Sequence, residues 1–182
     1  MAAAIKSSYG PYRFAAALIT SVKRDPLQIL EELQTGVGKQ IQFCRPDIVV
    51  SERQLVAAFA AAATTTMSGA ARSRRIEVEF LLRLSCQTQI QDAIKAAGLK
   101  GSEDKIIAAV ITTGDLDPEK ILINIAEKLG GKIEPFRRIT STENLMKTYC
   151  IDETQLKAIP KQDTIDPLEL IIIEKVVSSY VG

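Results

Sequence analysis

Four arginines in the middle of the chain form the pattern best suited to binding chemistry. Arg72, Arg74 and Arg75 fall within four residues, just before an apolar stretch that is expected to be helical. Positive charge at a helix start opposes the helix dipole, which favours anions there. A bound phosphate would relieve this repulsion and would accept hydrogen bonds from the backbone N–H groups of the first turn. This cluster, extended by Arg83, is the best candidate anion site.

An alternative explanation of the same residues is a row of ion pairs on a helix surface. Apolar residues cover most of a helical wheel drawn at about 100° per residue, and the remaining arc holds Arg72, Arg75, Glu79 and Arg83. This polar stripe is expected to face water, a partner or a ligand. Glu79 lies four residues from both Arg75 and Arg83, which is a spacing of helical ion pairs. The residues alone favour this pairing slightly, because such surface pairs are common.

Catalytic chemistry finds little support in the chain. The one candidate nucleophile is Cys86, which falls just before a second helical stretch, where a helix dipole can lower a thiol pKa. No histidine is present to act as its base, and Cys44 and Cys150 lie too far away in sequence for a zinc pattern. No phosphate-binding glycine loop, dinucleotide-binding motif or metalloprotease motif occurs. We predict no enzyme activity, no cofactor and no metal site.

The last helical stretch, which begins at Asp166-Pro167, carries a second candidate site. Its apolar residues span about 220° of the helical wheel, well beyond the roughly 100° of an ordinary surface helix. One explanation is a central helix that its own domain covers on both sides. The other is an exposed apolar patch that binds a partner protein. The residues predicted to contact such a partner are Leu170, Ile173, Val177 and Val181.

The elements that must position these residues alternate between strands and helices. Apolar runs predict strands over residues 12–22, 41–44, 47–50 and 105–112. Asp25, Ser51 and Asp117 are expected to cap the helices that follow them, and the helix after Ser51 is expected to end near Ala63. Residues 64–69 would then form a loop leading to the arginines. We predict a single α/β domain over residues 1–182, with a small mixed sheet packed against several helices.

Composition limits the classes of function. The hydrophobic content of 46% supports a real core, and the net charge of +1 means that nucleic-acid binding must come from a local cluster. The first residues lack the apolar run of a signal peptide, and no apolar span reaches about 18 residues. We expect a soluble, cytoplasmic protein with reduced thiols.

The central block resembles the signature of a known family. The matching positions are Arg72-Ser73-Arg74, Glu79, Leu82, Leu84-Ser85, Ile90, Ala93-Ile94-Lys95 and Gly98. Together they look like the TPRKB-type kinase-binding subunits of the KEOPS complex, in particular the archaeal-like ones. The resemblance extends over roughly residues 12–130 and the last helix, whereas residues 132–165 match nothing in the family. One departure is Cys86, where the family often has glycine or proline, so the turn at this point is expected to differ.

The resemblance implies a non-catalytic adaptor. Such subunits bind the N-terminal lobe of the complex's atypical kinase and hold tRNA by its unpaired 3′ acceptor end, while another, metal-dependent subunit makes threonylcarbamoyladenosine. The implied partners are thus the kinase, tRNA and, indirectly, the other KEOPS subunits, with no membrane. The RNA-binding residues would be Arg72, Arg74, Arg75 and Arg83. Base stacking would need an arginine plane or an aromatic ring from Tyr9, Tyr12, Phe136 or Tyr149.

Two other functions compete with this one. A pure protein-interaction regulator of the kinase would make no RNA contact. A small enzyme would use Cys86 as its nucleophile.

Overall fold

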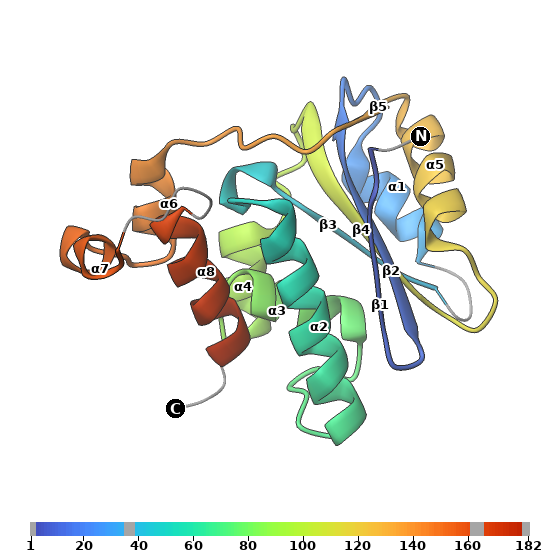
Figure 1. Ribbon diagram of the computed structural model, residues 1–182. Helices are drawn as coiled ribbons and strands as arrows, with labels where there is room; N and C mark the ends of the chain where they lie inside the picture. The colour runs from blue at the N-terminus through green and yellow to red at the C-terminus, as the bar shows by residue number, and fades with distance from the viewer. Residues whose placement is uncertain (1–2, 35–38, 161–165, 180–182) are drawn as a thin grey trace.

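The computed structural model describes residues 3–34, 39–160 and 166–179 (Figure 1). The first half contains strands β1 (Ile5–Tyr9) and β2 (Tyr12–Thr20), helix α1 (Pro26–Leu33), strand β3 (Lys39–Cys44), a 3₁₀ turn η1 (Pro46–Ile48) and helix α2 (Glu52–Ser68). Helices α3 (Ile76–Leu84) and α4 (Ile90–Ala97), strand β4 (Lys105–Thr113) and helix α5 (Pro118–Leu129) follow. The last part contains strand β5 (Lys132–Glu134) and helices α6 (Thr142–Thr148), α7 (Glu153–Ala158) and α8 (Pro167–Ser178).

The strands form one sheet in the order β1-β2-β4-β3, with β5 pairing to β2 beyond the end of β1. All pairings between the described strands are antiparallel, whereas a mixed sheet was expected. The expectation was wrong on this point because β2 and β3, which run in the same direction, are separated by β4 instead of pairing directly. Strand β3 pairs only with β4 among the described residues, and it therefore forms an edge of the sheet.

Helices cover both faces of this sheet, which confirms the predicted α/β class. Side chains that alternate along β2 point to opposite faces. Ala15, Ala17 and Ile19 pack with the α1 and α5 side, while Phe14 and Leu18 pack with α2 and α3. Figure 1 shows α1 and α5 on one side of the sheet and α2, α3, α4 and α8 on the other. The result is a three-layer arrangement with one apolar core on each face.

The predicted helix starts are confirmed by their caps. The side chains of Asp25, Ser51 and Asp117 accept hydrogen bonds from backbone N–H groups of the first turns of α1, α2 and α5, at 2.9, 3.2 and 2.9 Å. The carboxylate or hydroxyl oxygen thus satisfies a donor that has no partner within the helix.

Two boundaries differ from the sequence prediction. Helix α2 continues to Ser68 instead of ending near Ala63. Within this extension the hydroxyls of Thr64 and Thr65 donate to the carbonyls of Ala60 and Ala61, at 2.8 and 3.0 Å, so the helix backbone itself satisfies these polar side chains. The helix ends at Gly69 in a left-handed conformation. Residues 47–50, predicted as a strand, instead begin within the 3₁₀ turn η1.

The segment that follows β5 crosses the molecule to reach α6 (Figure 1). It is joined to the core by Tyr149, whose buried hydroxyl donates to the carbonyl of Ile48 at 2.7 Å and accepts from Gln54 Nε2 at 2.6 Å. Helix α8 then packs along α2. Residues 132–160, which the sequence resemblance left unplaced, therefore form part of the same folded unit.

Candidate functional site

The loop that carries the arginine cluster is fixed by a buried carboxylate. Glu79 Oε2 accepts backbone hydrogen bonds from Arg72 and Ser73, at 3.0 and 3.2 Å. Its other oxygen, Oε1, accepts from the Thr65 hydroxyl at 3.1 Å. Glu79 therefore joins the end of α2, the loop and α3, and it holds the arginine-bearing backbone in one position.

The polar stripe of α3 faces the interior, contrary to the expectation that it would be exposed. Glu79 and Arg83 are 0% and 3% exposed. Arg83 Nε lies 3.5 Å from Glu79 Oε1, and Arg83 Nη1 donates to the carbonyl of Val177 at 3.3 Å and to the Ser179 hydroxyl at 3.4 Å. The helical ion pair between Glu79 and Arg83 is thus real, but α2 and α8 cover it. Because Arg83 is buried, it is not placed to contact RNA directly.

The other three arginines lie together on the surface. Arg72, Arg74 and Arg75 are all exposed at the entry to α3. The surface-pair explanation supposed that Arg75 pairs with Glu79, but the structure does not show this pair. Arg75 instead contacts Glu77 Oε1 through Nε and Nη2, both at 2.6 Å, and the Glu77 side chain is only 4% exposed. The start of α3 has no side-chain cap, so the cluster lies at the positive end of an uncapped helix.

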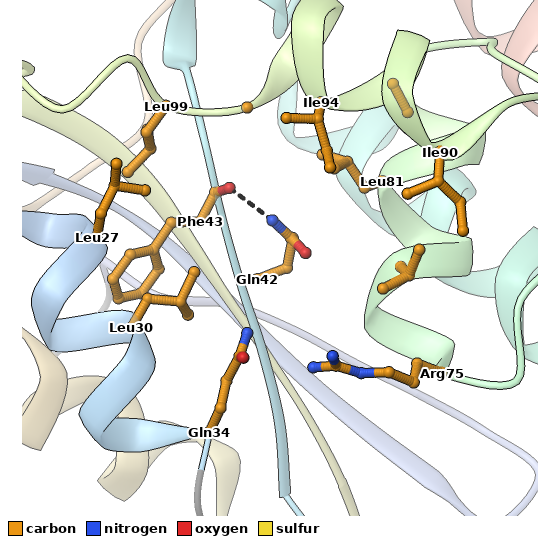
Figure 2. Close-up of a pocket in the computed structure, with 13 residues that line it drawn as sticks. Leu27, Leu30, Gln34, Gln42, Phe43, Arg75, Leu81, Ile90, Ile94 and Leu99 are labelled. Carbon is orange, nitrogen blue, oxygen red and sulfur yellow. Dashed lines mark hydrogen bonds between the residues drawn. The ribbon is translucent and has the colours of Figure 1, made fainter.

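An apolar groove begins beside this cluster and follows β3, and we call it the β3 groove. Its volume is about 260 Å³, and its walls come from α1, β3, α3, α4 and the residues after α4. Leu27, Ile90 and Ile94 are 40%, 45% and 52% exposed along it. In Figure 2, Leu27 and Leu30 lie on one side of β3, Ile90 and Ile94 lie on the other, and Arg75 extends between them toward Gln34. Large exposed apolar side chains that gather at one groove are characteristic of a binding site.

Sequence reasoning did not find this groove. The arginine cluster was recognised because its residues are neighbours in the chain. Leu27 and Leu30 come from α1, about 60 residues before Ile90 and Ile94, and each set fits an ordinary amphipathic helix. The only local signal was that Ile90 and Ile94 belong to the family-like block.

Helix α8 has one buried face and one exposed apolar face. Leu168, Ile172 and Val176 are at most 2% exposed in the core. On the other side Leu170 and Val177 are 37% and 47% exposed, and Ile173 is half-buried.

This arrangement excludes a helix covered on both sides by the described part of the chain. The exposed apolar surface is formed by Leu170, Ile173 and Val177, and we call it the α8 patch. Val181, the fourth predicted contact, lies outside the described residues.

The position of Cys86 before α4 offered a helix dipole that can lower the pKa of its thiol, but burial has the larger effect. Burial raises the pKa of this thiol to about 12 and outweighs the nearby positive charges of Lys175 and Arg83. The backbone here is left-handed, with φ at 55°, a conformation that glycine adopts without steric cost. This explains why glycine suits the same turn in the family that the sequence resembles.

Cys86 is therefore expected to resist alkylation at pH 8. With a pKa of about 12, roughly 10⁻⁴ of the thiol is ionised at that pH, and only the thiolate reacts. Iodoacetamide followed by peptide mass spectrometry should label the exposed Cys150 much faster than Cys86. Labelling of Cys86 should rise about tenfold per pH unit through pH 10. Equal labelling of both at pH 8 would contradict the raised pKa.

Two further kinds of site were sought in the described part of the chain. No group of three or more cysteine, aspartate or glutamate side chains is gathered there in a way that could hold a metal ion. None of the described helices is both long and apolar enough to cross a membrane.

Comparison with known proteins places the chain in a family. Residues 20–179 match the family described as kinase binding protein CGI-121, and this range includes the part after residue 131 that the sequence resemblance left unplaced. No curated protein matches the chain. The match confirms the resemblance to TPRKB-type subunits, while the narrower expectation of an archaeal-like subunit stays a prediction. The chain belongs to the CGI-121 family of kinase-binding proteins.

Proposed function

We propose that this protein is a non-catalytic, cytoplasmic adaptor of a KEOPS complex, which binds the kinase subunit and holds tRNA by its 3′ acceptor end. The synthesis of threonylcarbamoyladenosine would take place on another subunit, and this chain would need no cofactor. The kinase-binding family supports the first role. The observation that carries the second is the β3 groove, an apolar channel that begins at three exposed arginines.

The β3 groove has the chemistry that an unpaired RNA end requires. Single-stranded RNA is bound by apolar or aromatic surfaces that contact the faces of the bases and by cations that contact the phosphates. Leu27, Ile90 and Ile94 supply apolar surface, and Arg75 extends into the groove beside them (Figure 2). We assign Arg72, Arg74 and Arg75 to phosphate contacts.

Arg83 has a different part in this proposal. It is buried between Glu79 and the end of α8, so it would support the RNA-binding loop through Glu79 instead of contacting RNA. This assignment modifies the role that the resemblance implied for Arg83.

The α8 patch is the proposed kinase-binding surface. Leu170, Ile173 and Val177 lie on the side of α8 that faces away from the core. Val181 remains a predicted contact that lies outside the described residues. The patch lies on a different element from the β3 groove, whose walls include no residue of α8. One chain could therefore bind the kinase and the tRNA end at the same time.

The tRNA role is tested by changing Arg72, Arg74 and Arg75 together to alanine. Each phosphate contact on a single strand contributes about 0.7 to the slope of log affinity against log salt. In the triple variant the magnitude of that slope should fall by about 2. The variant should also bind tRNA at least tenfold more weakly at low salt. Fluorescence polarisation of labelled tRNA, with and without its unpaired 3′ tail, measures both quantities. Removing the tail should weaken binding by the wild-type protein.

A matched control is the triple alanine variant of Lys23, Arg24 and Lys128. These exposed residues lie near the end of α5, and their loss changes the net charge by the same amount. The control should bind tRNA like the wild type. If the folded arginine variant keeps the wild-type affinity and slope, the proposed RNA site is wrong. If the wild-type protein does not bind tRNA at all, the alternative of a kinase regulator without RNA contact is correct.

A further inference from the structure

The segment between α2 and α3, residues 69–75, carries the exposed arginines, and we call it the arginine loop. Its backbone is held by a carboxylate from outside the loop. Glu79 Oε2 accepts hydrogen bonds from the N–H groups of Arg72 and Ser73, at 3.0 and 3.2 Å. The loop therefore has two arrangements available to it, one held by Glu79 and one in which these N–H groups bond to water and the arginines have no fixed position.

The same carboxylate is connected to α8 through Arg83. Arg83 Nε lies 3.5 Å from Glu79 Oε1. At the C-terminal end of α8, Arg83 Nη1 donates to the carbonyl of Val177 at 3.3 Å and to the hydroxyl of Ser179 at 3.4 Å. Glu79 and Arg83 are both buried, so solvent screens their interaction only weakly. A buried series of polar contacts thus connects α8 to the arginine loop.

Val177 belongs both to this buried series and to the α8 patch. Its side chain is 47% exposed in the patch, whereas its carbonyl accepts from Arg83 inside the protein. A partner that covers the side chain therefore also fixes the carbonyl. The contacts that Arg83 makes with α8 and with Glu79 lie at the long end of the hydrogen-bond range, so they can shorten and strengthen when α8 is pressed from outside.

We infer that the buried Glu79–Arg83 pair couples the α8 patch to the arginine loop, so that a protein bound to the patch stabilises the held arrangement of the loop and strengthens RNA binding there. This inference rests on the proposed function and adds regulation to it. Once Val177 and Arg83 are fixed by the partner, the loop has less conformational freedom to lose when RNA binds. Because such coupling is reciprocal, RNA strengthens binding of the partner by the same factor.

Two kinds of variant interrupt the connection and keep the loop held. In Glu79→Gln/Arg83→Met the amide oxygen accepts from the loop N–H groups as the carboxylate does, and the amide nitrogen donates to the Thr65 hydroxyl that contacts Glu79 in the wild type. The methionine has no contact to offer to the α8 carbonyl. Ser179→Ala removes one contact of Arg83 and leaves the buried pair in place. Its matched control is Ser178→Ala, because the Ser178 hydroxyl donates to a carbonyl within α8.

The coupling is measured by fluorescence polarisation of labelled tRNA, with the full chain alone and with saturating kinase subunit. The kinase should raise the tRNA affinity of the wild type at least about fivefold, and tRNA should raise the kinase affinity by the same factor. The double variant should bind each partner alone like the wild type, but neither partner should affect the other. Ser179→Ala should reduce the factor, and Ser178→Ala should leave it unchanged. An absent effect in the wild type, or a full effect in the folded double variant, would overturn the inference.

Hydrogen exchange separates this inference from the proposed function, because it needs no RNA. Kinase binding should slow the exchange of the Arg72 and Ser73 amides in the wild type and not in the double variant, as measured by mass spectrometry of the peptides that contain them. If these amides are protected but tRNA never binds, the proposed RNA role is wrong and the connection from α8 to the loop is supported. If tRNA binds but neither its affinity nor the amides respond to the kinase, the inference is wrong and the RNA role stands.

Thermal melting curves identify any variant that does not fold. Ser179→Ala keeps the test decisive if the double variant unfolds, because Ser179 lies at the end of α8 and its side chain is only half-buried. A folded Ser179→Ala variant with the full wild-type coupling would contradict the assigned route.

Discussion

Val177→Glu is expected to abolish binding to the kinase subunit while the protein stays folded. Val177 is 47% exposed on the outer side of α8, so a glutamate there remains in water in the free protein. In the complex the same carboxylate would be buried without a partner, which costs several kcal/mol. A micromolar complex has a binding free energy of about 8 kcal/mol, and the variant complex should therefore be too weak to survive a pull-down. The tRNA affinity and the melting temperature should remain close to those of the wild type.

Met67→Glu is the matched control for this variant. Met67 is 49% exposed at the end of α2, so the substitution introduces the same charge at an equally exposed apolar position. It should leave kinase binding unchanged. Unfolding of Val177→Glu would show that Val177 is needed for the fold, and the α8 patch would then not be a free binding surface. Normal kinase binding by a folded Val177→Glu variant would place the interface on another surface.

The second large effect is expected on stability, from Glu79→Ala. Glu79 is fully buried, and it accepts hydrogen bonds from two backbone N–H groups and from Thr65 as well as pairing with Arg83. Its removal leaves the guanidinium of Arg83 buried without this carboxylate, and loss of one partner of such a pair typically costs about 3–5 kcal/mol. The free energy of unfolding, measured by urea denaturation, should fall by this amount. Because Glu79 also holds the backbone of Arg72, tRNA binding should weaken in any fraction that stays folded.

Two comparisons show whether the buried pair causes the loss. Glu127→Ala removes an exposed carboxylate from α5, and such surface changes usually alter stability by less than about 0.5 kcal/mol. The double variant Glu79→Ala/Arg83→Ala should lose clearly less than the sum of the two single variants, because the second change removes the charge that the first left behind. A loss below about 1 kcal/mol in Glu79→Ala would contradict the structural role of Glu79.

Local features of the fold could be predicted because their causes lie within a few residues. Asp25 and Asp117 cap their helices through N–H groups two residues away, and the apolar runs at β2 and β4 mark strands that are buried on both faces. The pattern around Arg72 also indicated the family correctly. The apolar width of the last helix showed that it has more apolar surface than one core face requires. For each of these features the neighbouring residues determine the structure.

Other features depended on residues that only the fold brings together. Glu79 and Arg83 have the spacing of a surface ion pair, but α8 covers them and supplies to Arg83 the carbonyl of Val177, which lies 94 residues later in the chain. The β3 groove needs α1 and α4 on either side of an edge strand. Periodicity and capping report on single elements, whereas burial and cavities arise from the packing of distant ones, so only the tertiary structure decided which of the polar residues are available to a ligand.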